Sequence, residues 1–517
     1  MLVRVCNQKN ECLLIICYVA VSVIASAVKL NYKKRFYMKG LRDITSFGKV
    51  EAEDDAVLQY FVEMNITKNI DQSDTFLVLG RKGSGKTAIF RYFTEDKHKA
   101  CSSALNLNGY PWRIHEKIKD DGVEPVESYV ASWKYFIAIE MVKLVLKLSD
   151  RYQMTEVIEL NKFLKDNYGT SYPSIKSIFT PLKLVVSGDL EPQILGCKIG
   201  KISLSKKEND MALGSELNAL TEKLLESVKK IAAVSEITKM FVHFDELDRG
   251  ITTLEEARKD MIIGLVLASK EVRKVLKGSD SFFKSVVYLR KDIWDELKFS
   301  DKNKITESNT DLIEWSHEQL FGLIEKRIEV LLGKKVKWTD IDDGKRINSQ
   351  PKWKHIIDRT LMRPRDVISF LNTLLEVTLK KDGDNLKFEN KDVVNARPKY
   401  SNYLKHELDD EILPHWEDWE VCLQALSRIG KLYFKKEDYA EAYRNIETRE
   451  GKTYSEYQSL EELYNFSVIE YEVRSGYGGS GWKSKFANPE LGWDINAIRF
   501  KVHLGLKEYM KLKEERT

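Results

Sequence analysis

The stretch TFLVLGRKGSGKTAIF, residues 75–90, constrains the fold of this 517-residue chain more than any other feature. An apolar run enters a turn rich in glycine and lysine, and a second apolar run follows. Gly80, Gly85, Lys86 and Thr87 fit the spacing G-x-x-x-x-G-K-[ST]. A strand that enters a helix through such a turn is typical of a phosphate-binding loop, and this context favours that interpretation over a plain flexible loop.

The chemistry of the turn suits a nucleoside triphosphate. Backbone N–H groups at the start of a helix offer donors and a favourable dipole to a phosphate chain. Glycines at these positions allow backbone conformations that other residues avoid. The residues expected to bind ATP here are Gly80, Gly83, Ser84, Gly85, Lys86 and Thr87. Lys86 would reach the β- and γ-phosphate oxygens, and the Thr87 hydroxyl would hold Mg²⁺.

A second acidic motif follows a buried strand in MFVHFDELDRG, residues 240–250. Asp245 has the position expected of a second Mg²⁺ ligand, and Glu246 could polarise the attacking water. The alternative is a solvated acidic turn after a strand. Asp248 and Arg249 could support the site or lie in such a turn. His243, inside the strand, is expected to be a buried core histidine.

Two further segments carry basic residues near the ends of predicted elements. Arg290 ends the run VVYLR, where a cation could sense the γ-phosphate. The alternative is a surface arginine that pairs with Asp292. The segment RPRD, residues 363–366, opens a predicted helix, and Pro364 and Arg365 are expected to contact the nucleotide from a lid. The alternative is helix N-terminal chemistry, with proline at an early helical position.

Strands alternate with helices over roughly residues 70–300, which predicts an α/β fold with a parallel sheet. The predicted ATPase core spans 38–300, with a helix over 50–65 and an insertion of short strands and turns at 150–215. Long helices are expected at 127–149, 216–234, 254–276, 316–332 and 364–380. Residues 301–400 would form a helical lid. The tail, 401–517, reads as helices followed by a hairpin with the tip RSGYGGSG.

Composition narrows the class of protein. Apolar residues make up 43% of the chain and charged residues 31%, as in soluble globular proteins. The net charge of +4, from 83 basic and 79 acidic residues, gives no global attraction to nucleic acid or anionic lipid. The six cysteines lack C-x-x-C spacing, which predicts neither a metal site nor a disulfide framework and suits a reducing cytosol.

The N-terminus is a separate problem. Residues 13–28, LLIICYVAVSVIASAV, are uncharged and mainly apolar, close to the length of about 20 residues that a spanning helix needs. The basic residues that follow would keep the remaining chain in the cytoplasm. Two interpretations stay open for residues 1–37: a single-pass inner-membrane anchor, or a mis-called start with the true one at Met38. A cytoplasmic location is expected for the rest of the chain.

The segments GRKGSGKTAIF, FVHFDELD, VVYLRKDIWDEL and RPRDVISFLN together resemble a family of bacterial P-loop ATPases. That family lies near the STAND and AAA-like NTPases and often occurs in defence or mobile-element gene neighbourhoods. The resemblance covers most of the chain from about Met38 and implies an ASCE-type P-loop NTPase. STAND proteins usually carry a threonine where this chain has Tyr288. In the tail, LYNFSVIEYEV and FKVHLGLKEYM resemble a winged-helix domain.

These features predict an intracellular Mg²⁺-ATP-binding switch, an ATP hydrolase whose turnover drives a conformational change. The resemblance implies phage defence or a DNA-linked process. The alternative is a nucleic-acid-binding module whose affinity is set by ATP, with phosphate contacts from Arg474, Lys483 and Lys485. In this alternative the tail would bind DNA. In the switch interpretation it would bind a protein partner. A homo-oligomer is compatible with the sequence.

Overall fold

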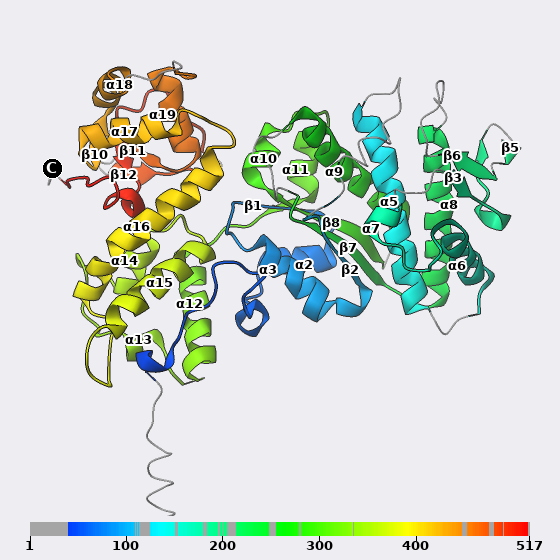
Figure 1. Ribbon diagram of the computed structural model, residues 1–517, viewed down its shortest axis with the longest axis horizontal. Helices are drawn as coiled ribbons and strands as arrows, with labels where there is room; N and C mark the ends of the chain where they lie inside the picture. Colours follow the sequence, from blue (N-terminus) through cyan, green and yellow to red (C-terminus); the bar gives the residue numbers. More distant parts are fainter. Residues whose placement is uncertain are drawn as a thin grey trace, which may run out of the picture.

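The computed structural model places three regions side by side: an α/β core, a set of helices beside it, and a C-terminal α+β region (Figure 1). It describes residues 40–108, 110, 112, 125–149, 153–178, 183–194, 197–198, 200–203, 213–247, 255–278, 281–333, 335–446, 452–474, 480–489 and 491–514. Within these residues, no helix combines the length and apolar character needed to cross a bilayer. The segment 13–28, with the anchor interpretation that rests on it, lies outside them, as do Asp248 and Arg249.

The core is built on a five-stranded parallel sheet. Its order is β2-β7-β8-β1-β9, and the bounds are Leu77–Gly80 for β1, Ser102–Asn106 for β2, Lys239–Asp245 for β7, Phe282–Arg290 for β8 and Thr310–Leu312 for β9. Strand β8 is inserted between the P-loop strand β1 and the acidic strand β7. This insertion is the ASCE arrangement of a P-loop NTPase, so the α/β fold class predicted from the sequence is confirmed.

Side chains alternate between the two faces of the sheet and enter two hydrophobic cores, because successive residues of a strand point in opposite directions. Val78 and Tyr288 pack with the helix that follows the P-loop, whereas Leu79 and Val242 face the long helices on the other side. The flanking helices are α2 (Asn65–Gln72), α3 (Lys86–Arg91), α5 (Pro125–Leu148), α8 (Leu213–Val234), α9 (Glu256–Leu276), α10 (Lys291–Glu296) and α11 (Lys302–Asn309).

The insertion forms a lobe at one end of the core, shown at the far right of Figure 1. It contains helices α6 (Thr155–Tyr168) and α7 (Ile175–Ile178) and the short strands β3 (Lys183–Val185), β4 (Gln193–Ile194), β5 (Cys197–Lys198) and β6 (Lys201–Ser203). The strands pair as two antiparallel ribbons. The predicted short strands are therefore present, and the 14-residue helix α6 is an addition that the sequence reading did not contain.

The helical region contains α12 (His317–Leu332), α13 (Trp338–Ile341), α14 (Lys352–Ile357), α15 (Pro364–Leu379) and α16 (Asn390–Ile412). The C-terminal region contains α17 (Trp419–Ile429), β10 (Tyr433–Lys435), α18 (Lys436–Arg444), α19 (Glu456–Asn465), β11 (Ile469–Arg474), β12 (Ser480–Lys483) and β13 (Arg499–Val502). Its strands form an antiparallel sheet in the order β10-β13-β11-β12. The α+β character of the tail and the predicted hairpin, β11 with β12, are confirmed.

The helix predicted over residues 50–65 was wrong. Residues 51–55 form turns and bends, a single 3₁₀ turn spans Val57–Tyr60, and the helix α2 starts only at Asn65. The segment instead serves as a strap, because Arg91 of α3 donates to the Asp55 carbonyl (2.9 Å) and Arg327 of α12 pairs with the Asp55 carboxylate (3.0 Å). Local apolar spacing suggested a helix where long-range polar contacts fix an irregular chain.

Candidate functional site

The P-loop has the geometry that its spacing predicts. The chain leaves β1 at Gly80, turns through Gly83 (φ 77°) and Gly85 (φ 106°), and enters α3 at Lys86. Both φ values lie in the left-handed region, which glycine adopts without the steric cost of a Cβ atom. Lys86 Nζ donates to the carbonyls of Gly80 (3.1 Å) and Arg81 (3.2 Å), so its ammonium lies over the loop.

Asp245 ends strand β7, two strands away from the P-loop strand, and is buried. Its neighbour Glu246 is also buried and has a φ of 60°, a left-handed conformation that is uncommon for a non-glycine residue. Buried Leu247 follows and anchors this turn in the core. Strained backbone of this kind is concentrated at functional sites, so the geometry of Glu246 fits a positioned carboxylate. His243 is fully buried, and burial lowers its pKa to about 3, as expected of a core histidine.

Arg290 ends strand β8 and lies in register with Gly80 of the P-loop strand. Its Nε donates to Asp292 Oδ1 (3.1 Å), and its Nη2 pairs with Asp292 Oδ2. Asp292 also receives His415 Nε2 at 3.2 Å, and His415 Nδ1 contacts Glu296. Burial alone would lower the pKa of His415, but its hydrogen bonds with the two carboxylates raise it to about 9. The alternative pairing of Arg290 with Asp292 is therefore present, but in a partly buried network rather than on the surface.

Residues of the helical region also contact the P-loop. Arg363 Nη1 donates to the Lys82 carbonyl (2.9 Å) and pairs with Glu411 of α16 (2.7 Å). Glu411 also accepts from Arg81 Nε and Nη2, at 3.2 Å each. Burial would raise the pKa of Glu411, but the charges of Arg81 and Arg363 outweigh it and lower it to about 2.

Pro364 and Arg365 lie at the first turn of α15. Arg365 packs so closely on Gly83 that a Cβ atom there would come within 2.9 Å of its side chain, and its Nη1 pairs with Glu407 of α16 (3.1 Å). Of the two predicted lid residues, Arg365 therefore does contact the P-loop, at Gly83. Whether they also contact a nucleotide stays a prediction.

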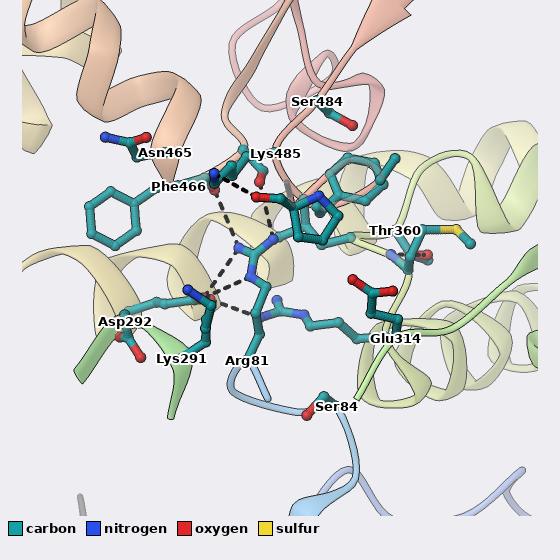
Figure 2. Close-up of a pocket in the computed structure, with 18 of the residues that line it drawn as sticks. Arg81, Ser84, Lys291, Asp292, Glu314, Thr360, Asn465, Phe466, Ser484 and Lys485 are labelled. Atoms are coloured by element: carbon teal, nitrogen blue, oxygen red, sulfur yellow. Dashed lines mark hydrogen bonds and ion pairs between the residues drawn. The ribbon is translucent and has the colours of Figure 1, made fainter. Parts of the chain in front are cut away.

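A cavity of about 1560 Å³ opens where the core, the helices and the C-terminal region meet. Figure 2 shows Arg81 extending from the P-loop into this space, toward Phe466 of the C-terminal region. Arg81 donates to the Phe466 carbonyl (3.3 Å) and to Ser467 Oγ (3.2 Å). Ser84 of the P-loop lines this cavity, whereas Lys86, Thr87, Asp245 and Glu246 do not.

The residues present fit Mg²⁺-ATP. Gly85, at the start of α3, has open space where a Cβ atom would lie, and the buried Ser84 hydroxyl has no hydrogen-bond partner among the described residues. Thr87 and Asp245 offer the hard oxygen ligands that Mg²⁺ prefers. Lys86 supplies a positive charge on the same loop.

Sequence reasoning missed the residues on α16 and beyond it that act on this site. Glu407, Asp410, Glu411 and His415 lie more than 300 residues after the P-loop, in a segment for which the sequence predicted no site residue. Trp315 was likewise not among the predicted site residues, yet its Nε1 donates to the Ser84 carbonyl (2.8 Å). No local motif marks these residues, because their partners are set by the packing of distant elements.

The sheet order and the loop geometry define the chain as having a P-loop NTPase fold. Among known proteins, a family model described as a FunZ-associated C-terminal helical domain matches residues 318–409. A relative from Escherichia coli (strain K12), a putative transposon gamma-delta 80.3 kDa protein, is 22% identical over 348 residues. That match covers 63% of this chain and 46% of the relative, so the chain spans less than half of that protein's length.

A solved structure, Cdc6p from Pyrobaculum aerophilum, is 11% identical, and the match covers 90% of this chain and 93% of that one. The TM-score is 0.27, so the fold assignment rests on the sheet order and the loop geometry of this chain.

Proposed function

We propose that the chain is a Mg²⁺-dependent ATP hydrolase that works as a conformational switch. The observation that carries the proposal is the meeting of three motifs at one edge of the sheet. The P-loop after Gly80, Asp245 and Arg290 follow three adjacent parallel strands, β1, β7 and β8, whose carboxyl ends share that edge. Ligands of open α/β sheets bind at this edge.

Each residue has a defined task in this proposal. When bound, Mg²⁺-ATP supplies the reactive phosphoanhydride and a cation that neutralises its charge. Lys86 would turn from the loop carbonyls to the phosphate oxygens, and Thr87 and Asp245 would hold the metal. Glu246 would orient the attacking water and accept its proton. Arg290 would stabilise charge on the γ-phosphate.

The contacts between the P-loop and α16 support a switch more than a metabolic enzyme. Arg81 and Lys82 belong to the loop itself, and both pair with acids of α16: Glu411 at 3.2 Å and Asp410 at 2.9 Å. A change in loop conformation would therefore alter the contacts of α16, which leads directly into the C-terminal region.

Two substitutions test the enzymatic part. Lys86→Ala is expected to abolish ATP binding, measured by calorimetry, because the loop then lacks its phosphate cation. Glu246→Gln is expected to bind Mg²⁺-ATP but to lower turnover by about 10²- to 10⁴-fold, because the general base is absent. Lys68→Ala, an exposed residue of α2, is the control and should leave both measurements unchanged. Normal turnover in Glu246→Gln would remove Glu246 from the mechanism.

The nucleic-acid alternative gains no support from the C-terminal region. The wing-like hairpin contributes Lys483 and Lys485, but Lys483 Nζ donates to Asn488 Oδ1 (3.3 Å) and Lys485 Nζ to the Pro489 carbonyl (2.7 Å). Helix α19, which precedes the hairpin, carries Glu456, Glu461 and Glu462 and no lysine or arginine, and such a helix repels phosphates. A protein partner therefore fits this region better.

The biological setting is proposed from the comparisons. The relative in Escherichia coli is named for a transposon, and we propose a mobile-element or defence context for this switch. ATPase rates with and without DNA, RNA and neighbouring gene products would identify the trigger.

A further inference from the structure

Asp292 is contacted by two cations that come from different parts of the molecule. Arg290 reaches it from the end of β8, two residues away, and binds both carboxylate oxygens. His415 reaches it from the segment just after α16 and donates from Nε2 to Oδ2 at 3.2 Å. The Oδ2 atom is therefore shared between Arg290 and His415.

The surroundings make this sharing energetically relevant. The side chains of Arg290, Asp292 and His415 are 10%, 19% and 12% exposed, so solvent screens their charges weakly. Charged hydrogen bonds in such places are stronger than neutral ones and depend on the number of partners. A carboxylate oxygen that serves two cations holds each of them less tightly than it would hold one alone.

The two cations belong to structurally distinct elements. Arg290 lies in register with Gly80, at the sheet edge where the γ-phosphate is expected. His415 follows Ile412, the last residue of α16, and four residues later the chain enters α17 of the C-terminal region at Trp419. Any change in how strongly Asp292 binds His415 therefore acts at the junction between the helices and the C-terminal region.

We propose that Asp292 is an exchange point through which the nucleotide state controls the docking of His415 and the C-terminal region on the core. This inference rests on the proposed ATPase function. When Arg290 turns to a γ-phosphate, Asp292 is left to His415 alone, and the docked segment 411–416 is held more tightly. When the γ-phosphate is lost, Arg290 returns to Asp292 and the hold on His415 weakens.

Thermodynamic linkage requires that this coupling also work in the opposite direction, from His415 to ATP binding. If ATP strengthens the contact of His415 with Asp292, docking of His415 must strengthen ATP binding by the same factor. His415 is thus a positioning residue, which acts on the nucleotide only through Asp292 and Arg290. Glu411, four residues before it, ties the same segment to Arg81, so both sides of the nucleotide site contact one stretch of chain.

Hydrogen exchange on the full-length protein tests the proposal. Exchange of the backbone amides of residues 408–416 is measured with a non-hydrolysable ATP analogue and with ADP, both in Mg²⁺ and at saturation shown by calorimetry. We expect exchange to be about 5- to 10-fold slower with the ATP analogue than with ADP in the unmodified protein. The difference should vanish in Asp292→Asn and in His415→Gln.

His406→Gln is the matched control, because His406 lies on α16 close to the measured segment, is exposed, and pairs with Asp409 of its own helix. It should keep the full difference between the two nucleotides. Equal exchange with both bound nucleotides in the unmodified protein would overturn the proposal, as would a difference that persists in a folded His415→Gln variant. Failure of both nucleotides to bind would instead remove the proposed ATPase function itself.

Discussion

At the scale of single residues, the site depends on buried charges that neutralise one another across elements. Glu411 holds Arg81 and Arg363, and Asp292 holds Arg290 and His415. Removing one member of such a group leaves the others charged and buried, which costs more than losing a surface pair. This makes the network sensitive to protonation.

The pKa of His415 sets the pH range over which protonation of this network affects stability. Its pKa is raised from 6.5 to about 9 by the hydrogen bonds with Asp292 and Glu296 in the folded chain. The protonated form therefore stabilises the fold fully below about pH 6.5, and the contribution is lost as pH rises through 9. The charged groups around His415 and its partners are Asp292, Glu296, Lys259, Arg290, Glu411 and Glu462.

The measurement is urea unfolding between pH 6 and 9.5 for the unmodified protein and His415→Gln. We expect the unmodified protein to be more stable at pH 6 and the gap between the two free energies of unfolding to close toward pH 9.5. A gap that stays constant over this range would show that His415 does not titrate in contact with the carboxylates.

At the scale of elements, helix α12 links the sheet to the helical region. Ser316 accepts from the Gln319 amide (3.2 Å) and caps its first turn, and Trp315 just before it binds the P-loop through the Ser84 carbonyl. The helix contains Gly322, which is exposed and has open space where a Cβ atom would lie. Glycine lowers the stability of a helix interior because the unfolded chain gains entropy.

Gly322→Ala is therefore expected to stabilise the protein by about 0.5–1 kcal/mol, measured by chemical denaturation. Gly83→Ala is the contrasting substitution, because Gly83 has a φ of 77° and a Cβ atom there would press on Arg365. It should destabilise the protein. A destabilising Gly322→Ala would mean that α12 tolerates no added methyl group despite the open space.

At the scale of the whole molecule, the helical region and the C-terminal region share one hydrophobic core. Trp338 of α13, Phe370 of α15, Trp419 of α17 and Phe500 of β13 all belong to it, together with Leu41 near the start of the described chain. Helix α16 runs between the two regions in Figure 1 and crosses the boundary predicted near residue 401. The two should open as one cooperative unit.

Trp419→Ala tests this cooperativity. Truncating a buried aromatic side chain costs about 3–5 kcal/mol, so we expect faster amide exchange in α17 and, equally, in α15 of the helical region. Trp133→Ala is the control, because Trp133 belongs to the separate core beneath the sheet. It should speed exchange in α5, α8 and α9 and leave α15 unchanged. Faster amide exchange confined to α17 in Trp419→Ala would show that the helical region and the C-terminal region are two independent domains.

The sequence by itself determined the features that depend on neighbours along the chain. The spacing of Gly80, Gly85 and Lys86 specified the P-loop, and apolar periodicity specified long helices such as α5 and α9. The buried run before Asp245 likewise indicated strand β7 and the core position of His243. In each case, local conformational preference and the burial of one face lead to the same structure.

Only the tertiary structure decided the rest. Strand β9 is three residues long and lies outside the core range 38–300, and it forms because β1 offers a free edge to Thr310–Leu312. The pairing of Glu411 with Arg81 joins residues that are 330 positions apart, and the contact of Asp292 with His415 joins residues that are 123 positions apart. Charges and short strands carry no periodic signal, and their partners exist only after distant elements have packed. The sequence therefore identified the P-loop, whereas the packing of α16 determined which side chains that loop contacts.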